Sequence, residues 1–103
     1  MSRMEKIREM LNQQPNDSFL LHALALEHIK IGQDSEALHC FNQLLGHNPA
    51  YLGSYYHLAK LHERSGNMQQ AASTYEKGIQ LAKETGDRHA LNELQIALDD
   101  IID

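Results

Sequence analysis

Seven histidines and one cysteine are the side chains of this chain that could bind a metal ion. A zinc site built on a helix needs ligands on one face, as in His-Glu-x-x-His, where four positions separate the histidines. No two histidines here stand three or four positions apart: His57 and His62 are five apart, and His22 and His28 are six apart. The spacing therefore predicts no metal site.

The residue types needed for catalysis are present but are not arranged for it. The glycines are isolated and form no phosphate-binding loop, and Cys40 and Ser73 fall within predicted helices. A hydrolase nucleophile needs a sharp turn between a strand and a helix. Asp99 and Asp100 are neighbours, so they point apart on a helix, whereas acid–base catalysis needs two carboxylates facing one substrate. We predict no catalytic residues and no cofactor, and therefore no enzyme.

The net charge of −5 comes from the carboxyl-terminal end of the chain. After residue 83, six acidic residues face the single base Arg88, whereas residues 1–83 hold eight acids and eight bases. An acidic end argues against nucleic acid, because nucleic-acid binding rewards a basic face. The length of 103 residues is that of one domain, and a hydrophobic content of 42% is ordinary for a globular protein.

The sequence predicts a cytoplasmic protein that does not bind membranes. No run of apolar residues approaches the length of a membrane span, and the charged, periodic amino terminus does not resemble a signal peptide. The single Cys40 allows no internal disulfide and suits a reducing compartment. The starting methionine and a capped first helix lead us to expect a complete small protein.

Much of the stretch 21–49 recurs 34 residues later. A fixed period that keeps small, aromatic and glycine residues in register indicates a stacked structural repeat. The matched pairs are Leu24 and Leu58, Ala25 and Ala59, His28 and His62, Gly32 and Gly66, Ala37 and Ala71, Phe41 and Tyr75, and Leu45 and Ile79.

The pattern resembles the tetratricopeptide repeat, in which a large residue, Leu and a small residue precede Ala-x3-aromatic and a final Pro. These slots are filled once by Leu21, Leu24, Ala25, Ala37, Phe41 and Pro49, and again by Tyr55, Leu58, Ala59, Ala71 and Tyr75. The departures are His28 and His62, where the family usually has tyrosine, and Lys83, where a second proline is expected. The resemblance implies an all-α, right-handed solenoid of antiparallel helix pairs.

Capping and helix-ending signals predict six helices. Ser2 and Glu5 form a capping box, Asp34 and Asp87 are expected helix caps, and Gly32 and Gly66 end helices. The predicted helices cover about 3–13, 17–31, 34–46, 52–65, 68–83 and 87 to the carboxyl terminus.

The repeat register predicts a single domain with a half repeat at each end. Leu11 lies 34 residues before Leu45, so the first helix resembles a second helix of a repeat. Matching Leu91 to Tyr55 requires 36 residues, so the last helix resembles a first helix after a lengthened linker. The predicted parts of the domain 1–103 are an amino-terminal cap (1–15), repeat 1 (18–51), repeat 2 (52–85) and a carboxyl-terminal cap (86–103).

Small residues are predicted where paired helices approach most closely. His28 and His62 are expected to be packed rings with one polar partner each, whereas His39 and His47 are expected to be exposed or near a turn. The predicted contact residues are Ala25, Ala37, Ala59 and Ala71, with Leu24, Phe41, Leu58 and Tyr75 filling the spaces beside them.

The family resemblance implies that the first helices of the repeats line a concave groove for a peptide or a partner helix. Leu26, Ile29, Tyr56 and Ile96 lie off the core stripes, so they indicate either a binding patch or, for the helix 17–31, burial beneath the first helix. The groove positions are Phe19, His22, Leu26, Ile29 and Lys30; Gly53, Tyr56, His57, Lys60, Glu63 and Arg64; and His89, Asn92, Glu93 and Ile96.

Tyr56 is the expected central anchor of this groove, with Leu26 and Ile96 on either side and His22 and His89 at the edges. Lys60 and Arg64 are one helical turn apart, so they either engage an acidic group of the ligand or pair with Glu63 or Glu93.

Some members of the family grip a carboxyl-terminal carboxylate with lysine, asparagine and arginine. None of the matching positions here carries the required residue, so recognition of chaperone tails is not expected. These positions are His22, Leu26, His57, His89 and Glu93.

Two functions follow from the predicted architecture. The first is an adaptor that binds a peptide or helix of another protein in the groove. The alternative is a module that associates with itself as a homodimer, because Ile96 and Ile102 lie outside the stripe of the last helix, where no further helix follows.

Overall fold

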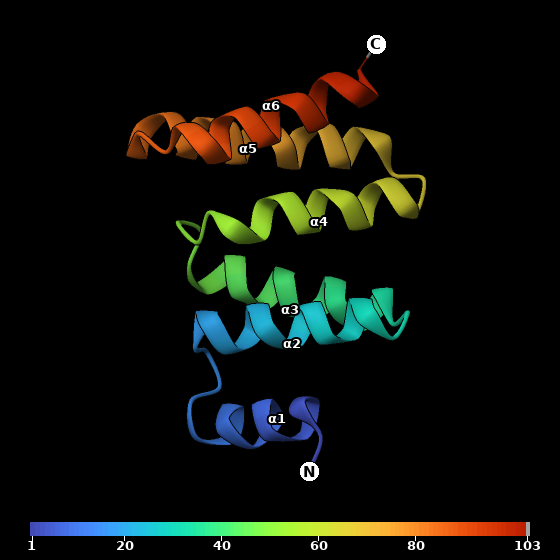
Figure 1. Cartoon of the computed structure of the whole chain (residues 1–103), viewed down its shortest axis with the longest axis vertical. Helices are drawn as coiled ribbons and strands as arrows, with labels where there is room; N and C mark the ends of the chain where they lie inside the picture. Colours follow the sequence, from blue (N-terminus) through green and yellow to red (C-terminus); the bar gives the residue numbers. More distant parts are fainter. Residues whose placement is uncertain (103) are drawn as a thin grey trace. The chain divides into compact units, whose positions relative to one another are not determined.

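The computed structural model describes residues 1–102, and this part of the chain contains six helices and no strand (Figure 1). The prediction of an all-α chain with six helices is therefore confirmed. The helices are α1 (Arg3–Gln13), α2 (Ser18–Lys30), α3 (Asp34–His47), α4 (Gly53–Arg64), α5 (Met68–Thr85) and α6 (Arg88–Ile101). Asp103, counted above in the acidic segment and in the predicted cap 86–103, lies outside the described residues.

The helix ends agree with local capping chemistry, with two corrections. Helix α5 continues to Thr85 instead of ending at Lys83, because the left-handed residue that stops it is Gly86 at φ 74°. Asp34 is not the cap of α3 but its first residue, where its negative charge still favours the helix amino terminus. The cap position is Gln33, whose side-chain oxygen accepts instead from His28 Nδ1 at 2.8 Å.

The other predicted caps are confirmed. The Ser2 hydroxyl accepts from the Glu5 amide at 3.1 Å, and the Glu5 carboxylate accepts from the Ser2 amide at 3.0 Å. Asp87 accepts from the Ala90 amide at 3.0 Å at the start of α6. These bonds satisfy amides that have no partner within their own helix.

The chain divides into two compact units, one of residues 1–51 and one that begins at Leu52. In the first unit α1 packs on α2, and α2 and α3 form an antiparallel pair (Figure 1). In the second unit α5 packs on both α4 and α6, antiparallel to each. The division falls between the predicted repeats 18–51 and 52–85, and the grouping of both into one domain stays a prediction.

The core of each unit is built around the predicted small residues. Ala25 and Ala37 in the first unit and Ala59 and Ala71 in the second are 0% exposed, as predicted. Gly78 adds a contact that the repeat pattern did not indicate. A Cβ at this position would lie 3.0 Å from Tyr55 Cβ and 3.0 Å from a Leu94 methyl group, so the missing side chain lets α5 approach α4 and α6 together.

The predicted division between packed and exposed rings is confirmed for His28, His39 and His47, whereas His62 is less buried than predicted. His28 is 2% exposed and bonds to Gln33, and His39 and His47 are exposed. His62 is half-buried, and this burial lowers the pKa of its ring. Within residues 1–102 no group of three or more histidine, cysteine or acidic side chains is arranged to hold a metal ion. No helix in this range is both long enough and apolar enough to span a bilayer.

Candidate functional site

Tyr56 lies at the centre of an aromatic cluster in the second unit. Its ring is half-buried and meets the edge of the Tyr75 ring at a centroid distance of 6.3 Å and that of the His57 ring at 5.6 Å. The Lys60 ammonium lies over the Tyr56 ring at 5.5 Å from its centroid. Two helices and a cation therefore fix the orientation of this ring while part of its surface stays open to a ligand.

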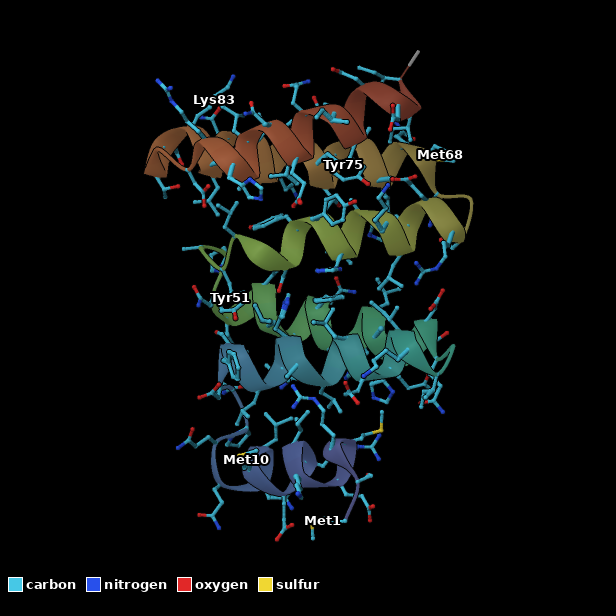
Figure 2. The ribbon with its side chains drawn as sticks, in the orientation of Figure 1. Met1, Met10, Tyr51, Met68, Tyr75 and Lys83 are labelled. Carbon is cyan, nitrogen blue, oxygen red and sulfur yellow. The ribbon has the colours of Figure 1, made fainter. Side chains whose placement is uncertain are left out.

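Glu63 organises the charges beside this cluster. Its carboxylate accepts from the Tyr75 hydroxyl and lies 3.5 Å from Lys60 Nζ. Figure 2 shows the Tyr75 side chain between α5 and α4. Burial and the neighbouring Glu63 carboxylate raise the pKa of Tyr75, so its hydroxyl stays a neutral donor. Of the two roles predicted for Lys60, the structure contains the pairing with Glu63.

His57 is the ring of this cluster whose charge can change near neutral pH. Burial lowers the pKa of His57, and the Glu93 carboxylate acts in the opposite direction without cancelling that effect. Because the usual histidine pKa is already near 6.5, the His57 ring is neutral at pH 7.

A small pocket of about 130 Å³ lies between the amino-terminal parts of α4 and α6. Three of its residues, Gly53, Tyr56 and Glu93, are among the predicted groove positions, so the fold brings part of that set together. We call this the Glu93 pocket, and its lining residues are Leu52, Gly53, Tyr56, Asp87, Ala90, Glu93 and Leu94.

One side of α6 continues from the pocket, because its residues lie one helical turn or less from the lining residue Glu93. His89, Asn92 and Ile96 are all exposed, and their spacing places them with Glu93 on one side of the helix. Ile96 is 64% exposed, which is unusual for a large aliphatic side chain. Arg64, the remaining predicted residue of this unit, is exposed at the last position of α4.

The predicted groove residues of α2 belong to the first unit, and four of them, Phe19, His22, Leu26 and Ile29, are apolar or aromatic. Phe19 is 67% exposed and shares a pocket of about 410 Å³ with Met10 of α1, while Leu26 and Ile29 are half-buried. His22 lies between two rings, with its centroid 5.7 Å from that of Phe41 and 5.5 Å from that of Tyr51. A binding role for these four residues stays a prediction.

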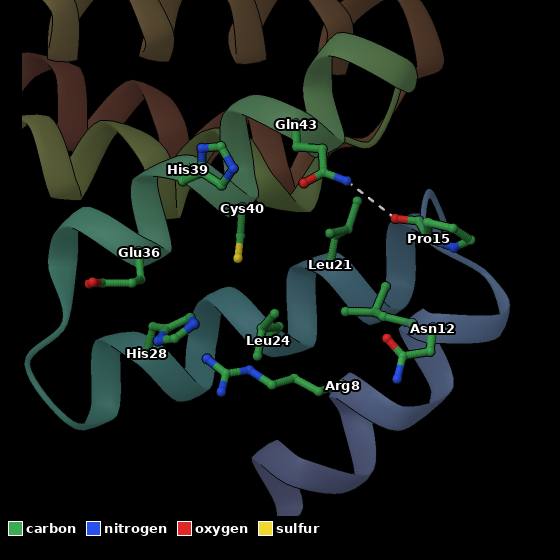
Figure 3. Close-up of a pocket in the computed structure, with 11 residues that line it drawn as sticks. Arg8, Asn12, Pro15, Leu21, Leu24, His28, Glu36, His39, Cys40 and Gln43 are labelled. Atoms are coloured by element: carbon green, nitrogen blue, oxygen red, sulfur yellow. Dashed lines mark hydrogen bonds between the residues drawn. The ribbon is translucent and has the colours of Figure 1, made fainter.

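A second pocket of the first unit was not predicted from the sequence (Figure 3). It has a volume of about 430 Å³ and is lined by α1, α2 and α3, with Gln43 donating to the Pro15 carbonyl at 3.2 Å. Cys40 points into it from α3, but burial raises the pKa of this thiol. A raised pKa is the opposite of what a nucleophilic cysteine requires. Its lining comes from residues up to 35 positions apart, Arg8 to Gln43, so no local pattern indicated it.

Comparisons with known proteins agree with the repeat register. The family model described as tetratricopeptide repeat matches residues 52–85, the range of the second predicted repeat. A crystal structure of a tetratricopeptide repeat domain protein from Salinibacter ruber is 44% identical, with a TM-score of 0.79, and the match covers 82% of this chain and 94% of that one. A solution structure of such a protein from the same organism is 43% identical, with a TM-score of 0.81 and coverage of 85% and 89%.

A solution structure of a Bordetella parapertussis protein is 25% identical, with a TM-score of 0.84, and the match covers 98% of this chain and 88% of that one. The comparison with curated proteins found no match. The similarity over nearly the whole chain confirms the predicted fold class, an all-α solenoid of helix pairs. Tetratricopeptide repeats are protein–protein interaction modules and are generally not catalytic. With its repeat register, its buried alanines and these relatives, the chain belongs to the tetratricopeptide repeat family.

Proposed function

We propose that this protein is an adaptor that binds a peptide or a helix of another protein, with Tyr56 as the anchor. The proposed contact area, here called the α4–α6 surface, comprises Tyr56, Lys60, His89, Asn92, Glu93 and Ile96. The observation that carries the proposal is the half-buried Tyr56 ring, held by Tyr75, His57 and Lys60 beside an open pocket.

The physical reason lies in how tyrosine contributes to protein interfaces. A ring already fixed by its neighbours loses little conformational entropy when a partner covers it, and it buries a large apolar area. The exposed Ile96 supplies a second apolar contact on α6. The charged rim formed by Lys60 and Glu63 is balanced within the protein, so it excludes water without repelling an apolar ligand.

Two further parts of the prediction are included in this proposal. Arg64 is proposed as a further contact residue of the second unit, and Phe19, His22, Leu26 and Ile29 are proposed as contact residues of the first unit. The proposed compartment is the cytoplasm, which suits a chain with a single free cysteine.

The proposal is tested by capture of the partner from the native cell followed by titration of the purified pair. Tyr56→Ala should weaken binding by about 2 kcal/mol or more, roughly a thirtyfold rise in Kd. Tyr56→Phe keeps the ring and should bind within about threefold of the parent. Full capture by Tyr56→Ala would remove the anchor role and with it the proposed site.

Self-association is the second candidate, and the observation that favours it is the exposure of Ile96 and Ile102, 64% and 60%. Ile96 lies in α6 and Ile102 at its carboxyl-terminal cap, and in residues 1–102 no other helix covers either side chain. Exposed aliphatic side chains of this size gain free energy when a second copy covers them.

A further inference from the structure

The Glu93 pocket holds two carboxylates, and the charge of one of them is already used. Asp87 accepts from the Ala90 amide at 3.0 Å and caps α6. The amino terminus of a helix carries a partial positive charge, which the Asp87 carboxylate balances. The negative charge left for a ligand is therefore that of Glu93.

Glu93 is exposed on α6, at the rim of this pocket. The ion pairs that join Arg3 and Lys30 to Glu27 and Lys60 to Glu63 use carboxylates other than Glu93. Glu93 faces the His57 ring of α4, and burial lowers the pKa of that ring, so it is neutral at pH 7. Glu93 thus places an exposed carboxylate at the edge of a partly apolar pocket.

The walls of the pocket suit the stem of a long basic side chain. Leu52, Ala90 and Leu94 supply apolar contacts, and the Tyr56 ring supplies an aromatic face. Lysine and arginine bury their methylene stems along such surfaces while the charged head stays at the rim, where a carboxylate binds it. A volume of about 130 Å³ is that of a site for one side chain.

We propose that the Glu93 pocket binds a lysine or arginine side chain of the protein partner, with the stem against Leu52, Leu94 and the Tyr56 ring and the cationic head at Glu93. This inference rests on the proposed function, because it names the chemistry of the ligand at the same surface. It differs from the acidic ligand expected from Lys60, whose charge Glu63 already balances.

The test uses a random peptide library displayed on phage and selected on the purified full-length chain. Peptides selected by the parent protein should share a lysine or arginine beside apolar residues. Replacing that residue by norleucine, which keeps the stem and removes the charge, should weaken binding to the parent about tenfold. The same replacement should change binding to Glu93→Gln less than about twofold, because the partner charge is gone.

Glu76→Gln is the matched control, since it removes an equal charge from an exposed position of α5. This variant should keep the tenfold preference for the basic peptide, and Glu93→Lys should select peptides with an acidic residue instead.

The outcomes separate this inference from the proposed function. The inference is overturned, and the proposed function stands, if the selected peptides need Tyr56 but contain no basic residue. The same holds if replacing the basic residue by norleucine weakens binding to Glu93→Gln as much as it weakens binding to the parent. Selection of no peptide at all, or of peptides indifferent to Tyr56→Ala, contradicts the proposed function as well.

Discussion

At the scale of single residues, the carboxylates of Glu63 and Glu93 in the second unit differ in the groups around them. Glu63 receives both the Tyr75 hydroxyl and the Lys60 ammonium, so these three groups form a closed set. Glu93 lies one turn from the exposed His89 and lines the Glu93 pocket. This difference makes Glu63 a structural group and Glu93 a candidate ligand group.

Tyr56 is expected to contribute to stability as well as to binding, because its ring contacts the buried Tyr75 ring. Tyr56→Ala should lower the free energy of unfolding by about 1 kcal/mol, the order of one aromatic pair. Tyr75→Ala, which empties a fully buried site, should lower it by about 3–5 kcal/mol. Denaturant unfolding measures both, and equal losses for the two variants would place Tyr56 in the core and not on a binding surface.

His57 should make stability depend on pH near neutrality. Its pKa in the folded protein is lowered by burial, so the unfolded chain binds the proton more readily and folding is favoured at higher pH. The free energy of unfolding should therefore fall as pH drops from about 7.5 to about 5.5, through the usual histidine pKa. His57→Gln should reduce this slope, whereas the exposed control His39→Gln should leave it unchanged in the same titration.

At the scale of helices, the internal and terminal elements differ at the positions of closest approach. Ala25 and Ala59 are fully buried, whereas Gln95, which takes the same place in α6 under the 36-residue register, is exposed. Arg3 of α1 takes the place of the buried Ala37 and reaches Glu27 at 3.4 Å. Long polar side chains at these places do not allow the close helix approach that alanine allows, and the role of α1 and α6 as caps stays a prediction.

Ala37→Leu and Ala71→Leu should each destabilise the protein by about 1–3 kcal/mol, because extra methylene groups enter a contact with no free space. Gln69→Ala on the exposed side of α5 is the control and should stay within about 0.5 kcal/mol. Thermal unfolding of the three variants provides the comparison. Parent-like melting of both leucine variants would show that the helix contacts are assigned to the wrong residues.

At the scale of the whole molecule, the acidic excess gathers at the carboxyl-terminal end while the rest of the chain is balanced. In the described residues this excess lies on α5, α6 and the turn between them, the same unit that holds the Glu93 pocket. A local negative field of this kind attracts basic partners and raises their association rate at low salt.

If Ile96 joins two copies of the chain, sedimentation will show a weight-average mass that rises with protein concentration. Ile96→Lys should then abolish the rise, because a charged side chain is not readily buried against a second copy. Gln69→Lys adds the same charge at an exposed position of α5 and should preserve the association if Ile96 is the contact. A constant monomer mass for the parent protein would remove self-association from the candidate functions.

The sequence by itself determined the repeat, the six helices, most of the caps and the buried alanines. These features depend on short-range chemistry: a side-chain oxygen three residues before an amide, a glycine that accepts a positive φ, and a fixed spacing of small residues. They could be predicted because each depends on neighbours in the chain or on a period that repeats. Asp34 shows the limit even here, since the Gln33 side chain bonds to His28 and the cap position has no side-chain cap.

Only the tertiary structure decided which polar groups meet across helices. The packing of α4, α5 and α6 determines that Glu63 contacts both Tyr75 and Lys60 and that Glu93 lines a pocket. The sequence left both alternatives for Lys60 available. The same holds for the close approach at Gly78, which joins residues from three helices. A periodic pattern specifies which face of a helix is buried, but the partner of each side chain depends on the distances and rotations that packing selects.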